Sequence, residues 1–250
     1  YKYSPEIQIE DKDIKNLISK SENLINKNFA DLFFNQTQIF RKNNFDLNCD
    51  RHFLIFRNYK IIPEFCFSCI KVTINVNNVI DLIKLFIIFD NINLPNNNLR
   101  KCMIDLRLDS KSNYKAFIYC RSTNEAEQIK NKLNKIVKLN ISDNLSFSIK
   151  RGCSEFNKKY PGYENSYKNL VTYNSNWKKY ENIIDEKFQK FQFKDKKQET
   201  TKGISFYDIM VIRNWMFFAH LTKDKSYKSI QENIIRNPGL EKIVRQNKPN

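Results

Sequence analysis

The sequence is poor in glycine, alanine and histidine, with four, four and two residues of each among 250. Four glycines leave little scope for backbone loops that cradle phosphates, and no phosphate loop, dinucleotide fingerprint or zincin motif occurs. The sequence has only two histidines, His52 and His220, and both stand in apolar surroundings. This argues against a histidine-based triad or proton shuttle. These shortages argue against nucleotide-hydrolysing, dinucleotide-dependent and histidine-based enzymes.

Cysteine and long apolar runs are also limited. Six cysteines do not make the disulfide framework of a secreted protein. The sequence opens without a positively charged leader, so we expect a reducing, intracellular setting. The longest apolar run, within residues 78–90, is shorter than the roughly 20 residues that span a bilayer, and charged residues interrupt it. We therefore expect no membrane span.

Positive charge is abundant. The net charge is +16, and Lys and Arg exceed Asp and Glu by 14 to 7 in residues 66–151 and by 19 to 11 in residues 152–250. Such an excess favours a nucleic acid or an acidic membrane surface as partner. Asn (34), Lys (33) and Ile (31) all have A- and T-rich codons. Codon bias therefore explains part of the lysine content and suggests a mitochondrion, a plastid or the cytoplasm of an AT-rich bacterium.

Residues 66–151 carry the clearest pattern. Apolar residues alternate over 66–76, 102–108, 114–120 and 145–150, which predicts four strands. Residues 78–90 and 122–139 predict helices, the second beginning at Ser122 with Glu125 three residues later. This order predicts an α+β fold, a ferredoxin-like βαββαβ sandwich with two helices on one face of a four-stranded antiparallel sheet.

The flanking segments are predicted to be mainly helical extensions, 1–65 and 152–250. We expect helices over about 13–27 and 29–40, and an added strand or short hairpin over 53–62. In the C-terminal extension a helix is expected from Ser205 to Leu221, with Asp208 completing an approximate capping box.

One segment resembles a known family. Residues 115–120, Lys-Ala-Phe-Ile-Tyr-Cys, and the helix start that follows resemble the third strand and second helix of an RNA-recognition-motif domain. In that family, exposed rings on this strand stack on bases. Tyr114, Lys115 and Lys71 differ from the family pattern, standing where glycine and two aromatic residues are usual. The resemblance covers about a third of the chain and implies RNA binding on the open sheet face.

The strand alternation assigns a basic, hydrogen-bonding character to that open face. With the C-terminal extension, where lysines interleave with aromatic rings, it gives the candidate RNA contacts. They are Lys71, Asn75, Arg107, Lys115, Phe117, Tyr119, Lys150, Arg151, Trp177, Lys178 and Lys179, with residues 194–197 as a further candidate. The alternative is that the C-terminal helices or another subunit cover the face and that the rings pack onto the main domain.

Cys153 is the candidate nucleophile, because Lys150 and Arg151 nearby could lower the pKa of its thiol. No base accompanies it in the sequence. The spacing of Cys66 and Cys69 suggests a metal site, but on a predicted strand they point to opposite faces. We expect neither a metal nor another cofactor.

The preferred interpretation is a non-catalytic RNA-binding protein, a structural subunit of a ribosome or another ribonucleoprotein that also contacts protein subunits. Two alternatives stay open. One is an enzyme that uses Cys153, and the other is a protein-binding scaffold.

Overall fold

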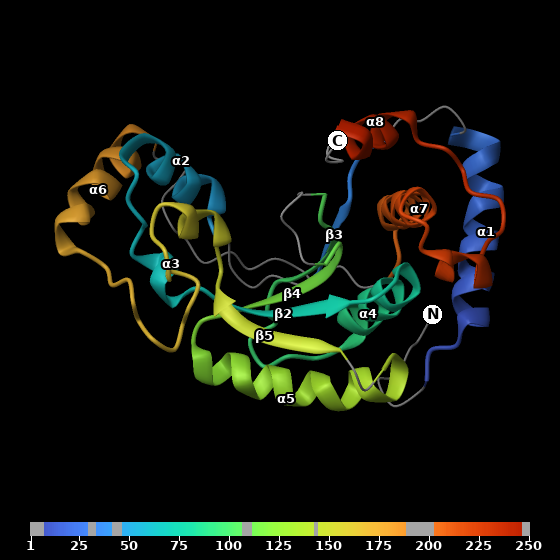
Figure 1. Cartoon of the computed structure of the whole chain (residues 1–250), viewed down its shortest axis with the longest axis horizontal. Helices are drawn as coiled ribbons and strands as arrows, with labels where there is room; N and C mark the ends of the chain where they lie inside the picture. The colour runs from blue at the N-terminus through green and yellow to red at the C-terminus, as the bar shows by residue number, and fades with distance from the viewer. Residues whose placement is uncertain are drawn as a thin grey trace.

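The computed structural model describes residues 8–29, 34–41, 47–106, 112–142, 145–188 and 203–246. In these ranges the chain forms a mixed α+β fold around one five-stranded sheet (Figure 1). The strands are β1 (Gln38–Arg41), β2 (Ile70–Val76), β3 (Arg100–Ile104), β4 (Tyr114–Cys120) and β5 (Ser146–Arg151). Their order is β1-β3-β4-β2-β5, and every neighbouring pair is antiparallel.

Helices surround the sheet unevenly. They are α1 (Asp11–Phe29), α2 (Cys49–Tyr59), α3 (Phe65–Ser68), α4 (Val79–Asn91), α5 (Thr123–Asn140), α6 (Lys178–Lys187), α7 (Phe206–Leu221) and α8 (Pro238–Gln246). Helices α4 and α5 pack on one face of the sheet. Helices α2, α3 and α6 form one lobe, and α7 and α8 form a second lobe, in which α7 packs against α4 and β1 (Figure 1).

Three predicted helix starts are confirmed in the structure. The side chain of Asn78 accepts a hydrogen bond from the Asp81 N–H at 2.9 Å, which caps α4. Ser122 Oγ accepts from the Glu125 N–H at 3.1 Å at the start of α5. Ser205 and Asp208 form a complete capping box on α7. Short polar side chains thus mark where the apolar helical patterns begin.

The N-terminal segments were predicted less well. The expected strand or hairpin over 53–62 is wrong, because α2 continues to Tyr59 and buries Arg51, His52 and Ile55 along one helical side. The helix expected over 29–40 is wrong in its last residues, where β1 pairs with β3. The strand predicted from Cys66 begins only at Ile70. Before it lies α3, entered through Pro63, whose carbonyl accepts from the Cys66 N–H.

The predicted α+β class is confirmed, although the sheet has five strands where four were expected. The fifth is β1, which comes from the predicted N-terminal extension. The main core also draws on the extensions, because Ile14 and Ile18 of α1 and Trp215 of α7 belong to it. Within the described parts of the chain, no helix combines the length and apolar content needed to cross a membrane.

Two buried arginines connect the N-terminal segments to C-terminal helices. Arg41, at the end of β1, contacts Asp90 of α4 at 2.6 Å and Asp208 of α7. Arg51 of α2 contacts Glu181 at 3.0 Å and Asp185 at 2.6 Å, both on α6. Removing the central cation would leave buried carboxylates without a counter-charge, which is strongly destabilising. The two clusters therefore fix one helix in each lobe.

Arg41→Met should lower the free energy of unfolding by about 3 to 5 kcal/mol, because Asp90 and Asp208 remain buried without their cation. Urea unfolding followed by circular dichroism measures this. The control is Lys130→Met, which breaks the half-exposed pair with Glu127 and should cost less than about 1 kcal/mol. Equal losses for the two variants would contradict a structural role for the Arg41 cluster.

Candidate functional site

The helix-free face of the sheet holds two adjoining hollows. The first has a volume of about 610 Å³, with strand residues on its floor and α2, α3 and residues 152–155 in its wall. The second, of about 660 Å³, lies over β2, β4 and β5. Both are lined by Lys71, Phe117, Ser154 and Glu155, so they form one continuous depression, here named the sheet-face groove.

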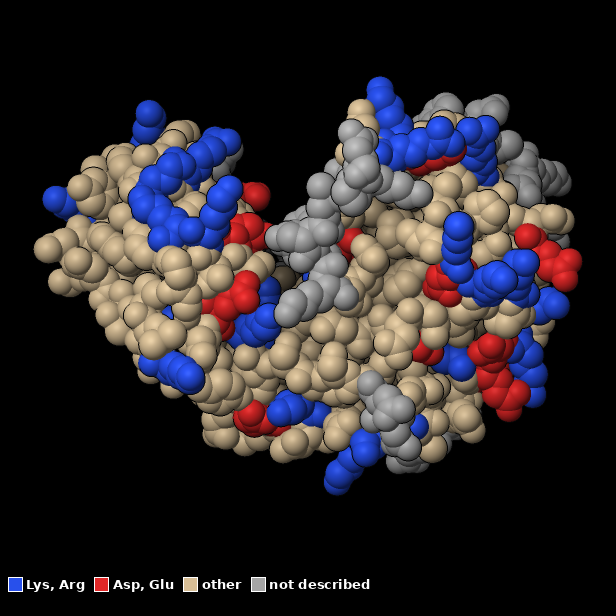
Figure 2. Space-filling model, viewed as in Figure 1, with Lys and Arg blue, Asp and Glu red and all other residues tan. Residues whose placement is uncertain are grey.

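The groove opens between the two lobes. Figure 2 shows the surface hollowed there, with Lys and Arg gathered over the lobe of α2 and α6 and along α8. Acidic side chains are interspersed on the same surface. Anions approaching this side of the molecule therefore meet a mixed but mainly basic surface.

A stack of rings and ammonium groups forms the groove floor. The ring of Phe117 lies between Lys71 and Lys101, each with its Nζ 5.3 Å from the ring centroid. Lys101 Nζ also lies 5.5 Å from the ring centroid of Phe40, a residue that is half exposed. At such distances the ring quadrupole attracts the cation. The rings thus hold two positive charges in place at the floor.

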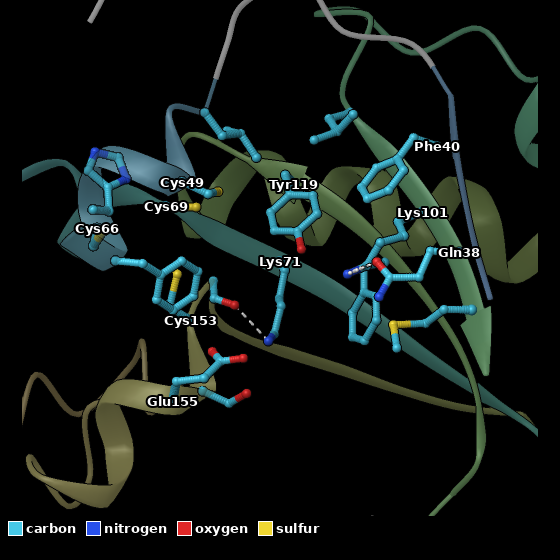
Figure 3. A pocket seen from close by; sticks show the side chains of 18 of the residues that line it. Gln38, Phe40, Cys49, Cys66, Cys69, Lys71, Lys101, Tyr119, Cys153 and Glu155 are labelled. Carbon is cyan, nitrogen blue, oxygen red and sulfur yellow. Dashed lines mark hydrogen bonds between the residues drawn. The ribbon is translucent and has the colours of Figure 1, made fainter. Parts of the chain in front are cut away.

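Lys71 is fixed most firmly. Its Nζ donates a 2.7 Å hydrogen bond to the Gly152 carbonyl, and the residue is only 8% exposed (Figure 3). Burial lowers its pKa from the usual lysine value. The backbone after β5 therefore orients this ammonium group toward the end of the groove where the cysteines lie.

The other lysines of the groove are more accessible. Lys115 pairs with Asp105 at 2.7 Å, and Lys150 pairs loosely with Glu164 at 3.4 Å. Lys158 is exposed at the rim. Five lysines and three acidic residues line the whole groove. The lysines are Lys71, Lys101, Lys115, Lys150 and Lys158, and the acidic residues are Asp105, Glu155 and Glu164. Its lining carries a net positive charge.

Six of the predicted RNA contacts come together in the groove. They are Lys71, Asn75, Lys115, Phe117, Tyr119 and Lys150. The strand register explains this, because Lys71 lies opposite Tyr119 on β4 and opposite Lys150 on β5. Side chains directly opposite in an antiparallel pair share a face.

Sequence reasoning missed Gln38, Phe40 and Lys101. Gln38 and Phe40 come from β1, which the apolar pattern of residues 29–40 assigned to a helix. The usable signal was the alternation of Ile39 and Arg41, both buried, with Gln38 and Phe40. Lys101 extends the predicted alternation of β3 by one residue pair toward its start.

The remaining predicted contacts lie elsewhere. Arg151 is buried and donates to the carbonyls of Tyr163 and Val171 and to Asn169 Oδ1, so it holds the chain that follows β5. Trp177 packs among Phe67, Tyr160 and Tyr173. Lys178 pairs with Glu64 at 2.9 Å, and Lys179 lies against Tyr180. Arg107 and residues 194–197 lie outside the described residues.

Four cysteines that form no disulfide line one wall of the groove (Figure 3): Cys49, Cys66, Cys69 and Cys153. In the described residues, no three His, Cys, Asp or Glu side chains are grouped so that they could hold a metal ion. Cys102 and Cys120 lie in the main core, where free cysteine behaves as a small apolar residue.

Comparisons of this chain with protein-family profiles, with curated proteins and with solved structures found no match. The resemblance of residues 115–120 to the RNA-recognition motif therefore stays a prediction. Any functional assignment rests on the groove itself.

Gly152 is needed where the wall meets the sheet. A Cβ at this position would lie 2.6 Å from Cys69 Sγ, closer than real Cβ contacts. The Gly152 N–H also donates to the Cys69 carbonyl at 2.8 Å, so the two backbones cannot simply separate. A side chain here would displace the segment that holds Lys71.

Gly152→Ala should destabilise the fold by about 1 to 3 kcal/mol through this overlap. Adding Cys69→Ala removes the sulfur and should recover part of that loss, so the double variant should be more stable than the sum of the single changes predicts. Thermal or urea unfolding of the four proteins in the cycle gives the coupling. If the stability losses of the two single variants simply add in the double variant, the contact between residues 69 and 152 does not cause the loss.

Proposed function

We propose that the protein binds single-stranded RNA along the sheet-face groove, without catalysing a reaction on it. The observation that carries the proposal is the groove itself: a continuous depression on the helix-free sheet face, with five lysines and five phenylalanine or tyrosine rings in its lining. Single-stranded nucleic acids are commonly held by such a combination, since ammonium groups neutralise phosphates and rings stack on bases.

The residues divide into two roles within this proposal. Lys101, Lys150 and Lys158 are partly or fully accessible and would meet phosphates. Phe40 is 50% exposed and Tyr119 is partly exposed, so these rings would stack on bases. Phe117 is only 8% exposed between two lysines, and it would position their charges rather than stack.

The finer fold assignment is part of the same proposal. We take residues 66–151 as a ferredoxin-like unit in which β3, β4, β2 and β5 form the four-stranded sheet and α4 and α5 cover one face. Strand β1 is then an addition at the β3 edge. RNA-recognition motifs expose the corresponding sheet face to RNA. The excess of positive charge favours a place in a ribosome or another ribonucleoprotein.

Binding of the purified protein to a mixed-sequence single-stranded RNA should weaken steeply between about 50 and 200 mM salt, because phosphate contacts release counterions. Fluorescence anisotropy measures the dissociation constant at each salt concentration. A DNA strand of the same sequence tests whether the 2′-hydroxyl contributes. If neither strand binds at the low-salt end, the proposal fails and the protein-binding scaffold becomes the better interpretation.

Charge removal locates the site. The triple variant Lys101→Gln, Lys150→Gln, Lys158→Gln should reduce the slope of log K against log salt by about 2, at roughly 0.7 for each lost phosphate contact. The matched control removes the same charge at exposed Lys15, Lys20 and Lys135, on α1 and on the α5 side of the sheet. Equal effects of the two variants would mean that net charge, not the groove, binds the RNA.

A further inference from the structure

The cysteine wall of the groove has features that RNA binding does not require. Its four thiols come from three segments: Cys49 from α2, Cys66 and Cys69 from α3 and its C-terminal cap, and Cys153 from the chain after β5. None of the four forms a disulfide, and all line the same hollow (Figure 3). Cys49 and Cys153 are partly exposed, whereas Cys66 and Cys69 are buried behind them.

Cys66 belongs to a small apolar cluster in this wall, and Cys153 packs against the same cluster. Cys153 is partly exposed toward the hollow, whereas Cys66 is 1% exposed behind it. The neighbouring Cys66 thiol lowers the pKa of Cys153, and the charges of Lys71 and Lys101 act in the same direction, whereas burial and the charge of Glu155 oppose them. Burial, with the neighbouring Cys153, raises the pKa of Cys66. Cys153, which also faces the hollow, is thus favoured as the thiolate of the two.

The surroundings favour a reaction at Cys153. Lys71 Nζ is fixed on the carbonyl of Gly152, the residue immediately before Cys153, so its charge stays near the sulfur. The thiolate is the reactive form of cysteine, and positive neighbours increase its fraction. Cys66 is a second thiol in the small apolar cluster against which Cys153 packs. An accessible thiolate with an adjacent second thiol is the arrangement of a redox-sensitive cysteine.

We propose that Cys153 and Cys66 form a redox-active pair that a small hydroperoxide converts to a disulfide. The Cys153 thiolate attacks the terminal peroxide oxygen, the O–O bond breaks, and the departing alkoxide or hydroxide takes a proton from solvent. This leaves a sulfenic acid on Cys153. The Cys66 sulfur then attacks the Cys153 sulfur, the S–O bond breaks, and the hydroxyl group leaves as water with the Cys66 proton. The two thiols lose two electrons in total, and the peroxide gains them.

The first test is the pH dependence of Cys153 alkylation by iodoacetamide. Because its pKa is lowered, the rate should reach half its maximum below the value of roughly 8.5 that is usual for a protein thiol. Cys66→Ala removes the neighbouring thiol that lowers the pKa of Cys153 and should move the midpoint upward. Mass spectrometry of the Cys153 peptide gives the rates. A midpoint at or above the usual value in the unmodified chain would overturn the assignment of Cys153 as nucleophile.

The second test identifies the product. The full-length chain is treated with hydrogen peroxide, its remaining thiols are blocked, and peptides are analysed without reduction. Cys153 should be oxidised at least about tenfold faster than the core cysteines Cys102 and Cys120, which serve as internal controls. A peptide joining Cys66 to Cys153 is expected. A disulfide from Cys153 to Cys49 or Cys69 would overturn the pairing, and oxidation no faster than that of the core cysteines would overturn the proposal.

Variants separate the two steps. With Cys66→Ser, Cys153 should still be oxidised but should accumulate as a sulfenic acid that dimedone traps. With Cys153→Ser, Cys66 should stay reduced. Cys69→Ser is the matched control in the same wall, and it should leave the Cys66 to Cys153 disulfide unchanged. Circular dichroism verifies that each variant is folded. Persistent loss of the Cys66 thiol in the Cys153→Ser protein would contradict the proposed order of steps.

Discussion

Two buried arginines provide the constraint on which the groove depends. Arg41 and Arg51 stand ten positions apart in the sequence, and each is held by two carboxylates. Arg41 attaches β1 to α4 and α7, and Arg51 attaches α2 to α6. A guanidinium group suits this role because it stays charged and donates to two partners in fixed geometry. The chain around these residues is thereby joined to one helix in each lobe.

On the floor of the groove, lysine ammonium groups lie close together on the sheet face. Lysines on neighbouring strands would repel one another if placed side by side, but the ring of Phe117 separates Lys71 from Lys101 and attracts both. The Gly152 carbonyl accepts a hydrogen bond from the Lys71 ammonium group, and the Gln38 side chain accepts one from Lys101 at 3.3 Å. The positive charges are thus positioned before any anion arrives, which reduces the ordering cost of binding.

The strands and helices of residues 66–151 could largely be predicted from the sequence, because period-two and helical patterns were clear and Asn78 and Ser122 marked helix starts. The same alternation placed Lys71, Phe117 and Lys150 on one face. Strand β1 could not be assigned from its four residues, since its pairing with β3 depends on contacts distant in sequence. The structural roles of Arg151 and Trp177 could not be predicted either. Both depend on tertiary contacts, which the local sequence pattern does not show.

The thiol wall illustrates the same limit. Residues 66–69 fit the alternation of the following strand, but residues 65–68 form a short helix, and Cys66 and Cys153 lie in one small apolar cluster. A strand would have directed Cys66 and Cys69 to opposite faces, whereas the helix places both in the wall of one cavity. A single turn of helix therefore decides whether these thiols can act together.

Lysine footprinting tests the central claim most directly. The protein, with and without bound single-stranded RNA, is briefly acetylated, and modification of each lysine is quantified by mass spectrometry. The account predicts that RNA protects Lys101, Lys150 and Lys158, which line the groove, and leaves exposed Lys15, Lys20 and Lys135 unchanged. Protection of Lys178 and Lys179 with the groove lysines unaffected, or uniform protection of all lysines, would contradict it.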